Sequence, residues 1–131
     1  MRRSLVVFSV LTLASACAHP AVDGPRPTDR TIVTREELVH TQYANLYDAV
    51  AALRRNWLQP RGADSFSNPS QVRVYLDNVL LGSTESLRNL PANSVMYMKW
   101  FDGVAATTRW GTDHASGVIF LSSRPLTPNP N

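Results

Sequence analysis

Cysteine, lysine and long apolar runs are all scarce in this chain of 131 residues. The single cysteine, Cys17, allows no intramolecular disulfide, so the fold must be held together by its apolar core. Lysine occurs once, at Lys99, and the arginines are scattered, so the formal charge of +3 indicates no basic surface for nucleic acid. The apolar run Leu5 to Leu13 is far shorter than the roughly 20 residues that a membrane-spanning helix needs.

The first 16 residues have the three parts of an export signal: a pair of arginines, the short apolar run, and small residues up to a cleavage site. The segment Leu13 to Cys17, which reads Leu-Ala-Ser-Ala-Cys, resembles the bacterial lipobox, whose cysteine sulfur receives diacylglycerol before cleavage. The resemblance implies a lipoprotein anchored by palmitate-type chains, each buried CH₂ adding about 0.8 kcal/mol of membrane affinity. Ala18 is not an acidic retention signal, which favours the outer membrane, facing the periplasm. The alternative is a secreted protein with Cys17 as a spare thiol.

Proline marks the edges of one domain. Three of the nine prolines lie in residues 20–27 and three in residues 125–130, in polar stretches without apolar periodicity. We therefore expect residues 17–30 to form a lipidated tether, residues 31–124 to form the folded domain and residues 125–131 to form a disordered tail. Loss of the leader, with its two arginines, lowers the formal charge from +3 to +1.

Helical periodicity is clearest after Asn45, a residue suited to capping a helix. The apolar residues that follow fall at i, i+3, i+4, i+7 and i+11: Leu46, Ala49, Val50, Leu53 and Trp57. Thr34 and Glu37 predict a capping box that opens a shorter helix. Two more short helices are expected, one that begins near Thr84 and one over Gly103 to Trp110.

Strand periodicity begins at Val72. Val72 to Leu76 alternates with a period of two and runs into Asp77-Asn78, a pair that tolerates positive φ and predicts a tight hairpin. Three further strands are expected at Thr31 to Val33, Val95 to Phe101 and Gly117 to Ser123. The second of these is apolar on both faces, so we expect it inside its sheet. Strands interleaved with short helices predict an α+β domain built on one small mixed sheet.

Three motifs stand out in this order of elements. They are Val74-Tyr75-Leu76-Asp77-Asn78-Val79 in the hairpin, Asp102-Gly103-Val104-Ala105-Ala106 followed by Arg109-Trp110-Gly111, and Gly117-Val118-Ile119-Phe120-Leu121 in the last strand. Between the first and the second lie the segments Leu87 to Leu90 and Val95 to Phe101, which belong to the same pattern. Together they resemble the plug domain of TonB-dependent outer-membrane receptors, and the similarity covers about residues 45–124. Asn78 and Trp110 depart from the glycine and tyrosine that are common in that family. The resemblance implies a plug-like fold.

The resemblance does not extend to a transporter. Receptor barrels have about 22 strands of roughly 9 to 11 residues each, which is more chain than the 131 residues contain. What the resemblance implies is a plug-like binding domain on a lipid tether, with an outer-membrane barrel or another envelope protein as its partner.

Chemically distinctive side chains gather between Arg109 and Ser116. The candidate contact residues for a partner or ligand are Arg109, Trp110, Asp113 and His114, which adjoin a glycine-flanked loop. Ser116, His114 and Asp113 also invite comparison with a catalytic triad, but residues this close in sequence rarely reach triad geometry. A polar turn in which Asp113 binds backbone N–H groups is the simpler interpretation.

No cofactor or metal site is expected. His19, His40 and His114 are far apart in the sequence, and no second cysteine supports them. We favour a non-catalytic binding module, with the loop Arg61 to Asn68 as a second contact surface. The alternatives are a small periplasmic hydrolase that uses Ser116, His114 and Asp113, and a purely structural envelope component.

Overall fold

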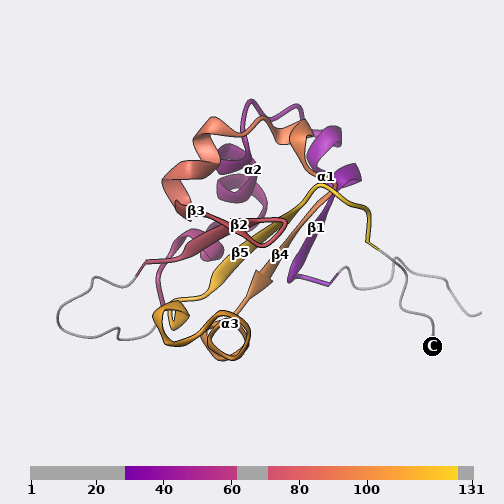
Figure 1. Ribbon diagram of the computed structural model, residues 1–131. Coiled ribbons are helices and arrows are strands. Elements are labelled where there is room, and N and C mark those ends of the chain that lie inside the picture. Colours follow the sequence, from indigo (N-terminus) through magenta and orange to yellow (C-terminus); the bar gives the residue numbers. More distant parts are fainter. Residues whose placement is uncertain (1–28, 62–70, 127–131) are drawn as a thin grey trace, which may run out of the picture.

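Five strands form one mixed sheet within the part of the chain that the computed structural model describes, residues 29–61 and 71–126 (Figure 1). In chain order they are β1 (Ile32–Thr34), β2 (Arg73–Leu76), β3 (Val79–Ser83), β4 (Tyr97–Phe101) and β5 (Val118–Ser122). Their order across the sheet is β1-β4-β5-β2-β3, with β2 parallel to β5 and the other neighbours antiparallel. The expected α+β fold class is confirmed, and β4 lies inside the sheet as predicted. The predictions for the leader, Cys17, most of the tether, loop residues 62–68 and the end of the tail fall outside the described residues.

The helices of the described residues lie on both faces of the sheet. The α-helices are α1 (Arg35–His40), α2 (Leu46–Leu53) and α3 (Gly103–Trp110), and the 3-10 helices are η1 (Arg55–Leu58), η2 (Thr84–Asn89), η3 (Ala92–Ser94) and η4 (Thr112–His114). α1 and α2 lie on one face and α3 lies on the other (Figure 1). None of these described helices has the length and apolar character needed to cross a membrane.

Two predicted caps begin the first two helices. Glu37 Oε2 accepts a hydrogen bond from the Thr34 backbone N–H at 3.1 Å, as the capping box requires. Asn45 Oδ1 accepts from the Asp48 backbone N–H at 2.9 Å at the start of α2. Each cap satisfies a backbone donor that has no partner inside the helix, a contribution of about 1 kcal/mol.

The single helix expected from Leu46 to Trp57 is interrupted at Arg54. α2 ends at Leu53, Arg54 takes φ −145° and ψ 51°, and the chain resumes as η1. The Arg54 guanidinium lies 3.4 Å from Glu37 Oε1 and also donates to the backbone carbonyl oxygen of Leu53 at 2.9 Å. The apolar spacing correctly identified Trp57 as buried, but α2 ends at a residue that contacts Glu37 of α1.

Strand alternation divides the core into two clusters. Val74 is fully buried against α1 and α2, whereas the next residue, Tyr75, points to the α3 side. The large side chains of the first cluster that are less than 2% exposed include Leu38, Leu46, Trp57, Leu87, Met98, Ile119 and Leu121. The second cluster consists of Tyr75, Ala106, Val118 and Phe120, packed against the partly buried rings of Tyr97, Phe101 and Trp110. The sheet is thus mostly aliphatic on one face and mostly aromatic on the other.

The predicted hairpin between β2 and β3 is confirmed. Asp77 and Asn78 form its turn with φ of 47° and 75°, values that Asp and Asn adopt more readily than most residues. The Asp77 carboxylate accepts hydrogen bonds from the Ser123 hydroxyl and, at 3.1 Å, from the Ser123 backbone N–H. The Ser123 hydroxyl is the main reason that the pKa of Asp77 lies below its ordinary value. These bonds fasten the turn to the end of β5.

Candidate functional site

The face of the sheet that carries α3 is built from side chains in register across the strands. One row crosses all the described strands through Ile32, Lys99, Phe120, Tyr75 and Leu80, and the next row holds Phe101, Val118 and Arg73. Because side chains alternate between faces along a strand, both rows lie on the face of the sheet that points away from α1 and α2. We call this surface the aromatic face and define it by Tyr75, Tyr97, Phe101, Trp110 and Phe120, together with the cations Lys99 and Arg109.

Trp110, the last residue of α3, joins the rings of the aromatic face. Its ring stacks on Tyr75, with centroids 5.0 Å apart and planes 24° apart, and it meets Phe101 edge-on at 5.1 Å. Phe101 in turn meets Phe120 edge-on at 6.2 Å. Pairs with these geometries add about 0.5–1.5 kcal/mol beyond the burial of their area. Gly111 ends the helix with φ of 102°, a value at which a side chain would be strained.

Arg109 is held over this ring cluster while its side chain stays exposed. Its guanidinium carbon lies 4.7 Å from the centroid of the Trp110 ring, 5.3 Å from that of Phe120 and 5.4 Å from that of Phe101. One N–H of the guanidinium, at Nη2, donates to Asn78 Oδ1 at 3.2 Å. This is the one hydrogen bond that Arg109 makes with the described residues, so most of its five N–H donors have no partner among those residues.

Lys99 supplies a second cation to the aromatic face. Its ammonium nitrogen lies 5.2 Å from the centroid of the Phe101 ring. The ion pairs among the described residues are Arg54 with Glu37 and Arg88 with Glu85, so neither cation of the aromatic face is paired with a described carboxylate. Lys99 and the rings of β4 and β5 were not among the predicted contact residues. The alternation of Tyr97, Lys99 and Phe101 along one side of β4 is the sequence signal that could have identified them.

His114 lies behind this surface. Only 8% of the residue is exposed, its Nε2 lies 2.8 Å from the Tyr75 hydroxyl, and its Nδ1 lies 3.1 Å from the Gly111 carbonyl oxygen. Because a carbonyl oxygen can only accept, Nδ1 of the neutral ring carries the proton and Nε2 accepts from Tyr75. Of the predicted contact residues, Arg109 and Asp113 are exposed and Trp110 is half-buried, while His114 supports the surface from below.

The predicted hydrolase arrangement needs a base directed at Ser116. Both ring nitrogens of His114 have other partners, Tyr75 and Gly111, and Ser116 itself is 1% exposed. Asp113 is exposed on η4 and makes no hydrogen bond to His114. The neighbouring positions in sequence therefore do not form the aligned acid, base and nucleophile of a triad. In the described part of the chain, no three His, Cys, Asp or Glu side chains are grouped closely enough to hold a metal ion.

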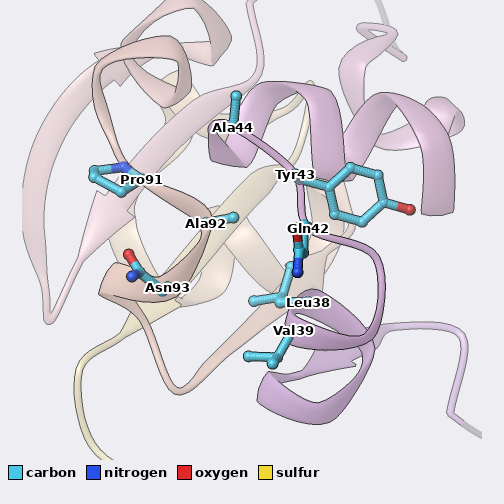
Figure 2. A pocket seen from close by; sticks show the side chains of 8 residues that line it. All are labelled: Leu38, Val39, Gln42, Tyr43, Ala44, Pro91, Ala92 and Asn93. Atoms are coloured by element: carbon cyan, nitrogen blue, oxygen red, sulfur yellow. The ribbon is translucent and has the colours of Figure 1, made fainter.

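A separate cavity of about 300 Å³ lies between the end of α1 and η3. It is lined by Leu38, Val39, Gln42, Tyr43, Ala44, Pro91, Ala92 and Asn93. Figure 2 shows Leu38 and Val39 of α1 across the cavity from Ala92 and Asn93 of η3. Its volume is at the lower end of the range for small-molecule sites, and no charged side chain lines it.

Comparison with known proteins found no relative from which a function could be inferred. No family model, no curated protein and no solved structure matches it. The likeness to receptor plug domains stays a prediction, and the functional argument depends on the geometry of the aromatic face.

Proposed function

We propose that this chain is a binding module, lipid-anchored in the outer membrane, whose aromatic face contacts another protein of the cell envelope. The observation that carries the proposal is the exposed guanidinium of Arg109, which is held over the rings of Trp110, Phe120 and Phe101. Arginine and large aromatic side chains are the residue types that contribute most to protein–protein binding.

The rigidity of the site supports this function. Ordering a long side chain on binding costs about 0.5–1.5 kcal/mol. Arg109 has much of that order already, because the three rings and the bond to Asn78 restrict its conformations. Trp110 is itself fixed from below by Tyr75, which His114 binds in turn. Of the four predicted contact residues, Arg109 and Asp113 are therefore exposed and Trp110 is a half-buried ring. His114 is buried and supports that ring through Tyr75.

Photo-crosslinking from three tyrosine positions tests the proposal. We would place p-benzoylphenylalanine at Tyr97 on the aromatic face, at Tyr43 beside the cavity of Figure 2, or at Tyr47 on α2, and irradiate cells that express the full chain. Tyr47 is the matched control, because it is a tyrosine that is half-buried like Tyr97 but lies on α2, under Arg88, with 3.6 Å between the guanidinium carbon and the ring centroid. A crosslinked envelope protein is expected from Tyr97 and not from Tyr47. Equal products from both positions would contradict the proposal.

The membrane anchor is tested separately at Cys17. Replacing Cys17 with serine removes the thiol that would carry diacylglycerol, so the chain is expected to leave the membrane fraction. A Cys17→Ser chain that is still cleaved at the same bond and still sediments with membranes would disprove the lipid anchor.

The cavity of Figure 2 supports a second candidate, the binding of a small apolar ligand. Its volume of about 300 Å³ and its uncharged lining are the observations that favour this function. Val39 is 55% exposed, so Val39→Trp would fill the cavity from its open side without disturbing the core. Native mass spectrometry of the full chain is expected to find a bound small molecule that the variant lacks. If the parent chain and the Val39→Trp variant have the same mass after correction for the substitution, no small molecule depends on this cavity and the candidate is removed.

A further inference from the structure

We propose that the aromatic face binds an extended acidic peptide of its partner protein, with Arg109 and Lys99 binding two of the peptide's carboxylates. This inference rests on the proposed function and adds the chemistry of the partner.

Charge complementarity is the first argument. Neither Arg109 nor Lys99 forms an ion pair within the described residues. Two carboxylates of the surrounding elements accept hydrogen bonds from other donors: Asp102 from the Ala105 backbone N–H at 2.8 Å, and Asp77 from Ser123. The exposed Asp113 forms no ion pair with either cation. Asp29 accepts hydrogen bonds from the hydroxyl and the backbone N–H of Thr31, which lower its pKa most, and the charge of Lys99 lowers that pKa further. Within the described residues the two cations thus have no ion-pair partner, and we assign that role to carboxylates of the partner protein.

The shape of the Arg109 guanidinium is the second argument. A guanidinium presents its N–H donors as a planar fork that matches the two oxygens of a carboxylate. Arg109 uses one donor for Asn78, and the rings of Trp110, Phe101 and Phe120 fix the position of the fork. A carboxylate thus meets a donor pair that is already placed.

The layout of the face suits an extended chain. Lys99 and Arg109 lie 5.2 and 5.4 Å from the centroid of the same ring, that of Phe101. The two cations are therefore at most about 11 Å apart. Acidic residues at i and i+2 of an extended peptide project to one side about 6.6 Å apart, and their flexible side chains extend the range over which two carboxylates can bind. The exposed parts of Tyr97 and Phe101 offer apolar contact to the residues that flank these acids.

An anionic membrane is a weaker match. Binding to such a surface is the sum of small contributions from several basic residues, and this face offers two. The chain's formal charge of +3 includes two arginines in the leader, so the mature domain has little net positive charge to add. Binding of this kind needs a cluster of basic residues, whereas a peptide needs two well-placed cations with apolar contacts beside them.

Fluorescence anisotropy with a defined peptide tests the inference on the full chain in detergent. The probe is a blocked, labelled peptide of alternating glutamate and valine, and its matched control has glutamine in place of glutamate. We expect the glutamate peptide to bind about tenfold more tightly than the glutamine peptide, since a charge-assisted bond is roughly twice as strong as a neutral one. Arg109→Gln is expected to weaken binding about tenfold and Lys99→Gln by less, because lysine binds as a point charge.

Arg88→Gln is the matched control variant, because Arg88 also packs over a ring, that of Tyr47, but is already paired with Glu85 at 2.8 Å. Its affinity for the glutamate peptide is expected to equal that of the wild type. Equal binding of the two peptides, or an Arg109→Gln chain with unchanged affinity, would overturn the inference. So would inorganic phosphate that competes as well as the peptide, which would identify a simple anion site. Phosphatidylglycerol vesicles that bind the chain when the peptide does not would identify a lipid surface instead.

The two proposals fail in different ways. If the crosslink from Tyr97 appears but the glutamate peptide does not bind, the acidic-peptide inference is wrong and the binding-module proposal stands. If the peptide binds but no position-dependent crosslink forms, the binding-module proposal is wrong. Circular dichroism of each variant distinguishes lost binding from lost fold.

Discussion

The two faces of the sheet use side chains differently, although β4 and β5 contribute to both. Under α1 and α2, Met98 and Ile119 are fully buried in an aliphatic cluster. Their neighbours in sequence, Lys99 and Phe120, point to the aromatic face. There Tyr75 and Phe120 are buried, but the other three rings and the two cations are only partly covered or exposed. The first face meets the requirement of a fold, which is close packing of apolar groups. The second keeps charged and aromatic groups in fixed positions at the surface, which a fold alone does not require.

The largest expected effect is on the packed face. Trp57 is 1% exposed and stacks on Trp100 with ring centroids 6.1 Å apart. Trp57→Ala would leave a cavity that the neighbours cannot fill, and we expect the free energy of unfolding to fall by about 3–5 kcal/mol. Chemical denaturation measures this change. A loss below about 1 kcal/mol would mean that the aliphatic face is not the main source of stability.

Alanine substitutions at two glycines with positive φ distinguish the cost of backbone strain from the cost of a steric clash. Gly117 (φ 95°) has no room for a side chain, since a Cβ there would lie 2.5 Å from the Trp100 ring and 2.9 Å from the Phe101 carbonyl oxygen. Gly82 (φ 124°) has open space around it. Both alanine variants incur the strain of positive φ, about 1–3 kcal/mol. Gly117→Ala is expected to lower the midpoint of thermal unfolding further than Gly82→Ala, and equal midpoints would contradict the close packing around Trp100.

A smaller effect is expected where the buried histidine supports the aromatic face. Tyr75→Phe removes the hydroxyl that donates to His114 Nε2 and leaves a buried acceptor without its partner, at a cost of about 1–3 kcal/mol. Near-ultraviolet circular dichroism is expected to change as well, because Trp110 stacks on Tyr75. Tyr97→Phe is the control, and we expect little change in its denaturation midpoint. If the two variants are equally stable, the hydrogen bond from Tyr75 to His114 contributes nothing.

The smallest effect is expected at the hairpin turn, whose Asn78 accepts the hydrogen bond from Arg109. The pKa of the Asp77 carboxyl is lowered chiefly by the Ser123 hydroxyl, so its stabilising contribution is present above the ordinary Asp pKa and is lost as the pH falls through the lower folded pKa. In Ser123→Ala, an NMR titration is expected to show the pKa of Asp77 moving up toward its ordinary value. A pKa that does not move would show that the turn is not fastened by this bond.

The parts of this structure that depend on local chemistry could be predicted from the sequence. Asp77 and Asn78 specified the hairpin, Asn45 specified the start of α2, and the alternation of Val74 and Tyr75 placed them on opposite faces. These features depend on residues that are neighbours along the chain.

The parts that depend on distant residues could not be predicted. Arg54, where α2 ends, contacts Glu37, a residue 17 positions earlier, and the buried His114 contacts Tyr75, a residue 39 positions earlier. The position of Arg109 over three rings requires β4, β5 and α3 to come together. The sequence therefore identified Arg109 and Trp110 as candidate contact residues, but it did not predict which side chains hold them in position.

The most direct test of the central claim combines stability and binding in one variant, Arg109→Ala. Arg109 is exposed, so its loss is expected to lower the free energy of unfolding by about 1 kcal/mol or less. The crosslink from p-benzoylphenylalanine at Tyr97 is expected to fall about tenfold in the same variant. A crosslink yield equal to that of the parent chain, in a folded Arg109→Ala protein, would contradict the claim that the aromatic face is the binding surface.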